Sequence, residues 1–144
     1  MISPVKKLFM AFLAFFSCVW VQAHDFTVTQ NGQRLCFNFK SKKDRTIEVT
    51  YFGSIAESNV PKLAGTIEIP GKVKHNNEVY TVVCIGEKAF SGAVNLEGVI
   101  IPASVKTIEN FAFEDCRNLS TVVFPGENIK WGQGVFFKCK SIKN

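Results

Sequence analysis

The sequence predicts a mostly β protein with short helical or 3₁₀ turns, in which N-terminal β-hairpins lead into a short solenoid of stacked coils. Two observations support this fold class. Apolar and polar residues alternate through the first part of the chain, and one residue pattern recurs at a constant spacing through the C-terminal part. The chain has 144 residues, 47% of them hydrophobic, which suits one folded domain and is short for several.

The segment 1–23 has the layout of a signal peptide. Lys6 and Lys7 precede an apolar run at residues 8–21, and Ala23 then supplies the small residue that signal peptidase accepts at its cleavage site. The apolar run has 14 residues, whereas a membrane-spanning helix needs about 20. We therefore expect cleavage before His24 and no integral membrane span after the signal is removed.

Lipoprotein processing at Cys18 is a second way in which this segment can be read. Ser17 is small enough to precede a lipidated cysteine, but Phe15 stands where a leucine is expected. Both routes predict an exported protein, either secreted or held at the cell surface. Cleavage before His24 removes two lysines and no acidic residue, so the net charge falls from +5 to +3. This charge is scattered, and we expect no nucleic-acid partner.

Residues 24–80 are expected to form a β-hairpin region that caps the solenoid. Asn31-Gly32 separates the first two strands, and both residues tolerate the positive φ of a tight turn. The alternating pattern predicts strands at residues 26–29, 35–39, 46–51, 66–69 and 79–85, the last of which continues into the next region.

Residues 81–144 are expected to form leucine-rich repeats, with two coils and a truncated third. The 23-residue step from Phe90 to Phe113 is repeated from Phe113 to Phe136. A period of about 20–29 residues is typical of leucine-rich repeats. The same step links Ile85, Ile108 and Trp131; Ala89, Ala112 and Val135; Asn95-Leu96, Asn118-Leu119 and Ser141-Ile142; and Ile101-Pro102 with Phe124-Pro125. Stacking these coils buries apolar edges that one coil cannot bury alone.

Each coil is expected to have a strand side and a turn side. The inward residues of the strand side are Leu96, Val99 and Ile101, which recur as Leu119, Val122 and Phe124. On the other side, residues 105–113 carry apolar residues three and five apart, which predicts a turn or a short 3₁₀ segment. The prolines after the strands lack an amide donor and end them.

The sequence IGEKAF at residues 85–90, followed by NL-x-x-V-x-IP at residues 95–102, resembles the repeat of the bacterial BspA-like leucine-rich repeat surface proteins. This resemblance implies export and a curved solenoid. The family includes adhesins, so it also implies a protein partner such as a host matrix or cell-surface protein. Three residues depart from the pattern: Glu109 stands where the repeat prefers glycine, Ala93 occupies the column held by Cys116 and Cys139, and Val135 replaces the alanine.

The outward positions of the repeat strands are the candidate partner-binding residues. Ile100 and Val123 form an apolar column on the concave side, where solenoids tend to bind partners. Ordinary β-propensity on a half-covered face explains the same column equally well. The full candidate set is Glu97, Ile100, Ser120, Thr121 and Val123.

The sequence gives no catalytic, cofactor-binding or metal-binding motif. His24 and His75 are the only histidines, and there is no GxSxG, HExxH, Walker loop or CxxC. We therefore predict a protein that is not an enzyme and needs no cofactor or metal. A basic turn at residues 40–45 fits a solvated turn better than a binding patch for acidic glycans.

Four cysteines follow the signal peptide, which leaves disulfides open in an exported chain. Cys36 and Cys84 lie in predicted strands, whereas Cys116 and Cys139 share a repeat column. Stacked coils place the Cα atoms of such a column about 5 Å apart, which a disulfide tolerates, although small buried thiols that pack well are the simpler expectation.

The function that the sequence predicts is adhesin-like binding to a protein or a cell surface. The alternative is a structural or assembly subunit that pairs through an open C-terminal end of the solenoid. A truncated fragment of a longer repeat protein is a further alternative, because the third coil stops before its strand is complete.

Overall fold

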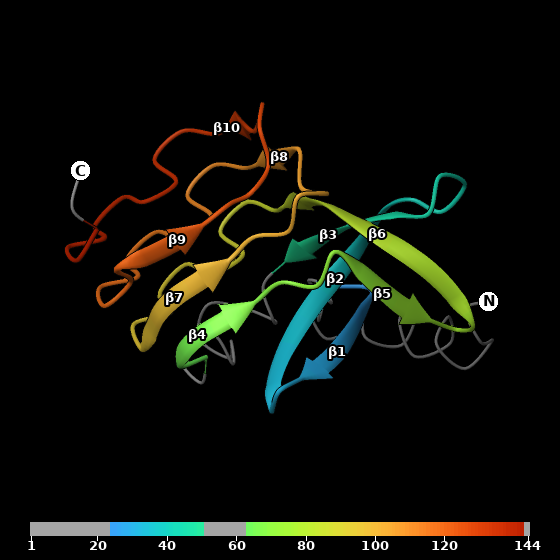
Figure 1. The fold of residues 1–144 in the computed structure, drawn as a ribbon, viewed down its shortest axis with the longest axis horizontal. Coiled ribbons are helices and arrows are strands. Elements are labelled where there is room, and N and C mark those ends of the chain that lie inside the picture. Colours follow the sequence, from blue (N-terminus) through green and yellow to red (C-terminus); the bar gives the residue numbers. More distant parts are fainter. Residues whose placement is uncertain (1–23, 51–62, 143–144) are drawn as a thin grey trace, which may run out of the picture.

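The computed structural model describes residues 24–50 and 63–142, which form two β-sheets (Figure 1). The larger sheet has seven strands in the order β1-β2-β3-β6-β8-β10, with β5 paired to β6, and the smaller sheet has the order β4-β7-β9. The strands are β1 (Phe26–Gln30), β2 (Gln33–Ser41), β3 (Thr46–Thr50), β4 (Gly65–Glu68), β5 (Lys72–His75), β6 (Glu78–Ile85), β7 (Leu96–Ile100), β8 (Thr107–Ile108), β9 (Thr121–Val123) and β10 (Lys130–Trp131). The predicted mostly β repeat fold is confirmed.

Tight turns connect the antiparallel strands at the N-terminal side of the fold. Asn31 and Gly32 have φ values of 50° and 75°, and the Asn76 and Asn77 pair between β5 and β6 has 49° and 63°. Asparagine and glycine tolerate this left-handed region, and two such residues in succession match the twist of a hairpin. The predicted turn between β1 and β2 is therefore present.

The large sheet changes from antiparallel to parallel pairing at β3. β3 pairs antiparallel with β2 but parallel with β6, and β6, β8 and β10 then follow one another in parallel. Phe37, Ile47 and Val49 are completely buried beneath this junction. The hairpin strands thus extend one side of the solenoid and share its core.

The smaller sheet begins earlier in the chain than the predicted repeats. β4 lies within residues 24–80, yet it pairs in parallel with β7, so that Ile67 is opposite Val99. The dipeptides Ile69-Pro70 and Ile101-Pro102 end equivalent strands, but more than one 23-residue step separates them in the sequence. The extra residues form the β5–β6 hairpin. The boundary at residue 80 stays a prediction, but β4 is structurally a strand of the repeat sheet.

In the described residues the turn side of the coils contains turns and neither helix nor 3₁₀ segment, so the predicted turns are present and the predicted helical or 3₁₀ geometry is not. Left-handed backbone recurs with the repeat in two columns. Lys88, Phe111 and Gly134 have φ values of 55°, 55° and 59°, and Gly92, Asp115 and Lys138 have 79°, 58° and 61°. Each coil thus has two left-handed residues four positions apart, which interrupt right-handed helical geometry. Consecutive tight turns therefore direct the apolar residues inward.

The repeat columns form the core of the solenoid. The Phe113 ring stacks on Phe90 at 5.0 Å and on Phe136 at 5.6 Å between ring centroids. Leu96, Val99, Ile101 and Leu119 are all fully buried, as predicted.

Phe124 is the exception among the predicted inward residues, because 47% of it is exposed. It follows β9, the outermost described strand of the small sheet, and no further described coil covers it. Its ring instead meets Trp131 edge-on, with 5.5 Å between centroids.

Candidate protein-binding surface

The side of the small sheet that faces away from the core is termed here the outer sheet face. Alternation along the strands directs Ile67, Val99 and Val122 toward the core and their neighbours outward. The parallel register places these outward positions in two rows, which are Thr66, Gly98 and Thr121, and Glu68, Ile100 and Val123.

The second row carries the apolar pair that the sequence predicts. Ile100 is paired with Val123, and these residues are 36% and 46% exposed. Glu68 lies opposite Ile100 on the other neighbouring strand and is also exposed. Two branched apolar side chains therefore stand next to each other on a fixed sheet, with a carboxylate at one end of the row.

Glu97 and Ser120 lie at the start of β7 and just before β9. The pairing of β4 with β7 shifts register here, because Gly65 is opposite Leu96 and Thr66 is opposite Gly98, which leaves Glu97 as the extra residue of a bulge. The Ser120 amide donates to the Glu97 carbonyl at 2.9 Å, and the Ser120 hydroxyl donates to the same oxygen at 3.3 Å.

Thr121 is opposite Gly98 and completes the candidate set. All five predicted residues are exposed; four lie in β7 and β9, and Ser120 lies just before β9. Their role in binding stays a prediction. Sequence reasoning missed Thr66 and Glu68, which belong to the same face; the available signal was the Ile-Pro dipeptide at residues 69–70, which matches the end of the repeat strands.

Most basic side chains of the turn at residues 40–45 contact other residues of the same chain. Lys40 Nζ lies 2.9 Å from Glu48 Oε2, and the hydrogen bond to Glu48 raises the pKa of Lys40 above its usual value. Arg45 pairs with Glu78 at 3.3 Å. Lys42 Nζ lies over the Phe39 ring, 4.6 Å from its centroid. These contacts favour the interpretation of a solvated, structural turn.

Glu48, Cys84 and Glu109 place their ligand atoms within 4.8 Å of one another, the one such group of possible metal ligands in the described residues. Lys40 supplies a positive charge there, since its Nζ is also 3.4 Å from Glu109 Oε1. Burial, followed by the negative charge of Glu109, raises the pKa of Cys84 to about 12, so the thiol keeps its proton at neutral pH. Because Lys40 pairs with both carboxylates, we assign this cluster a structural role.

This cluster accounts for the departure of Glu109 from the glycine of the repeat. One carboxylate oxygen accepts a hydrogen bond from the Glu87 amide at 3.1 Å, and the other faces Lys40. Glu109, just after β8, therefore links β2 to the turn that follows β6. The sequence signal was present as a charged residue in a glycine column, but its partner is 69 residues away.

His24 precedes β1, and His75 is the last residue of β5, which pairs with β6. The His75 ring stacks on Phe26 with 4.1 Å between centroids, and its Nε2 is 3.1 Å from Asn76 Nδ2. Burial lowers the pKa of His24, against the opposing effect of the Asp25 charge. These contacts assign His75 a packing role beside the β5–β6 turn.

Across residues 24–50 and 63–142, no helix has the length and apolar character needed to cross a membrane.

Comparison with protein families gives a match over residues 71–144 to the family described as "BspA type Leucine rich repeat region (6 copies)". No curated protein matches the sequence.

Solved structures show the same architecture. A leucine-rich repeat protein from Bacteroides ovatus is 28% identical, with a TM-score of 0.68 over 84% of this chain and 29% of that chain. A leucine-rich cell surface protein from Faecalibacterium prausnitzii is 23% identical, with a TM-score of 0.59 over 83% of this chain and 30% of that one. The leucine-rich repeat protein of T. pallidum is 22% identical, with a TM-score of 0.59 over 75% and 44%. The chain thus spans less than half of each of these proteins.

Proposed function

Because the chain belongs to the BspA-type leucine-rich repeat family, we propose that it is an exported interaction module that binds a protein partner at or near the cell surface. The observation that carries this proposal is the exposed apolar pair of Ile100 and Val123 on the outer sheet face. The partner class that fits is a host matrix or cell-surface protein, which makes the role adhesin-like.

The outer sheet face is held in place by the core behind it. Val99, between Gly98 and Ile100, is completely buried, and β7 is paired on both sides. A partner therefore meets side chains that are already positioned, which reduces the conformational entropy lost on binding. The net charge of +3 after signal removal gives little electrostatic attraction, so the contact is expected to depend on shape and apolar area.

The double variant Ile100→Lys, Val123→Lys is expected to lose binding to immobilised matrix proteins, while the parent remains bound at roughly 0.5 M salt, where charge–charge contacts are screened beyond about 3–8 Å. The fold should persist because both side chains point outward. Surface plasmon resonance gives the binding readout, and circular dichroism checks the fold.

The matched control is Val79→Lys, which changes an equally exposed apolar residue, 47% exposed, on the hairpin strand β6. It should bind like the parent. Normal binding by the double variant, together with loss of binding when residues 40, 42, 43 and 45 are neutralised, would move the site to the basic turn and contradict the proposal.

Export and surface localisation are part of this proposal. The signal-peptide features lie in residues 1–23, outside the described residues, and both the cleavage before His24 and the lipoprotein alternative at Cys18 stay predictions. The support comes from the family and from the similar F. prausnitzii structure, which carries the words "cell surface protein" in its description.

Assembly through the far end of the solenoid is the second candidate function, and exposed aromatic residues favour it. Phe124, Trp131 and Phe137 are 47%, 42% and 51% exposed beside the outermost described strands β9 and β10. Among the described residues no further strand pairs with the outer edge of β9 or β10, and these edges together with the apolar rings form a surface suited to another repeat chain.

Static light scattering distinguishes the two functions. Assembly predicts a concentration-dependent rise in mass at micromolar protein that Trp131→Lys removes, whereas a monomer throughout this range would contradict it. Because Trp131 is not on the outer sheet face, the same variant should leave binding to an immobilised partner unchanged.

A further inference from the structure

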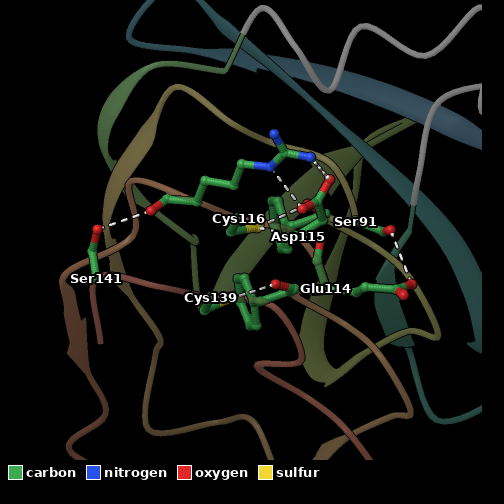
Figure 2. Close-up of polar contacts among 9 residues, drawn as sticks. Ser91, Glu114, Asp115, Cys116, Cys139 and Ser141 are labelled. Atoms are coloured by element: carbon green, nitrogen blue, oxygen red, sulfur yellow. Dashed lines mark hydrogen bonds and ion pairs between the residues drawn. The ribbon is translucent and has the colours of Figure 1, made fainter. Parts of the chain in front are cut away.

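Cys116 and Cys139 occupy the same column in neighbouring coils of the solenoid (Figure 2). Cys116 Sγ donates to the Phe90 carbonyl at 3.1 Å, and Cys139 Sγ donates to the Phe113 carbonyl at 2.9 Å. Each thiol therefore makes the same contact, one repeat apart.

Hydrogen bonds hold these coils in register on both sides of the cysteines. The Asp115 amide donates to the Phe137 carbonyl at 2.8 Å, and the Ser141 hydroxyl donates to the Arg117 carbonyl at 2.8 Å. Cys116 and Cys139 lie outside the strands, but these contacts place residues one repeat apart side by side, which is the arrangement that a disulfide needs, with its Cα separation of about 4.4–6.8 Å.

We propose that Cys116 and Cys139 are a built-in oxidation site that closes to an intercoil disulfide when the protein meets an oxidising thiol–disulfide couple. Bond formation would remove both thiol donors, yet it would orphan neither acceptor. The Phe90 carbonyl also accepts from the Ala93 amide at 3.0 Å, and the Phe113 carbonyl also accepts from the Cys116 amide at 3.4 Å. The bridge therefore costs no buried unsatisfied carbonyl.

Cys139 is the thiol that reacts first. It is half-buried, whereas Cys116 is completely buried. The neighbouring Cys139 thiol, together with burial, raises the pKa of Cys116, whereas the neighbouring Cys116 thiol lowers the pKa of Cys139. The greater exposure of Cys139 and its lowered pKa both favour it as the attacking thiolate.

The reaction balances with an external disulfide such as oxidised glutathione. The Cys139 thiolate, having released its proton to water, attacks one sulfur of glutathione disulfide and expels one glutathione thiolate, leaving a mixed disulfide on Cys139. Cys116 then loses its proton and attacks Cys139 Sγ, which expels the second glutathione. The two cysteines are oxidised, one glutathione disulfide is reduced, and the two protons pass to the released glutathione thiolates or to water.

The other two described cysteines are not placed for a competing bridge with each other. Cys36 lies in β2 and Cys84 in β6, with β3 between them in the sheet. Burial raises their pKa values to about 11 and about 12. Both are expected to stay reduced thiols in the folded protein.

The test is equilibration of the full chain with oxidised glutathione, followed by alkylation of free thiols and tryptic peptide mapping without reductant. The expected product joins the peptide of residues 107–117 to the dipeptide of residues 139–140, two hydrogen atoms lighter than the separate peptides. This product should disappear on reduction, and the unfolding midpoint of the oxidised chain should be several degrees higher, because the bridge restricts the unfolded state. The same map distinguishes any disulfide formed by Cys18, because Cys18 lies in a different tryptic peptide.

Single variants test the order of the reaction. Cys116→Ala should accumulate a glutathione mixed disulfide on Cys139, whereas Cys139→Ala should leave Cys116 as a thiol. Cys36→Ala is the matched control and should form the bridge like the parent. Full alkylation of both Cys116 and Cys139 in the folded, oxidant-treated chain would overturn the proposal, as would a bridge from either one to a different cysteine.

Discussion

Replacing Phe113 by alanine is expected to lower the free energy of unfolding by about 3–5 kcal/mol, the usual cost of emptying an aromatic core site. Phe113 is completely buried and its ring is stacked between Phe90 and Phe136, so the cavity lies at the centre of the solenoid. Native stabilities are commonly about 5–15 kcal/mol, and the variant should therefore lose a large part of its stability. Urea unfolding followed by circular dichroism measures the change.

Phe137→Ala is the matched control for this experiment, because it removes the same ring from a position that is 51% exposed. We expect a loss of less than about 1 kcal/mol there, as for most surface substitutions. Equal stability of the parent and Phe113→Ala would show that the Phe90, Phe113 and Phe136 column is not the core.

Gly132→Ala is expected to destabilise the protein by about 1–3 kcal/mol through overpacking. A Cβ at this position would lie 2.6 Å from both the Asn110 amide nitrogen and the Glu109 carbonyl carbon. Backbone atoms cannot rotate away as a flexible side chain does. The two coils must therefore separate locally, which weakens the hydrogen bond of 2.7 Å from the Gly132 amide to the Ile108 carbonyl.

Gly126→Ala controls for the general effect of replacing a glycine with alanine. The nearest atom to its added Cβ is the Ala103 carbonyl oxygen at 3.6 Å, an ordinary contact. It should be neutral or slightly stabilising, because alanine restricts the unfolded chain. Thermal unfolding of both variants gives the comparison, and equal midpoints would contradict the close approach of the coils at Gly132.

The sequence by itself determined the repeat, because stacking imposes the same environment on every residue at a given phase of the coil. The constant step from Phe90 to Phe113 and Phe136 was sufficient to predict three stacked rings. The Asn31-Gly32 pair was sufficient to predict a hairpin, since its conformation depends on only a few neighbouring residues. Pairing of Ile100 with Val123 followed from the same register.

The tertiary structure alone decided features that depend on residues far apart in the chain. β4 pairs with β7 although a hairpin inserted between them in the sequence breaks the regular repeat spacing. Glu109 receives its role from Lys40, which no periodic pattern links to it. Phe124 follows the inward pattern yet is exposed, because burial depends on a neighbouring coil as well as on phase. Repeat phase determines which way a side chain points, whereas the three-dimensional neighbours determine what it contacts.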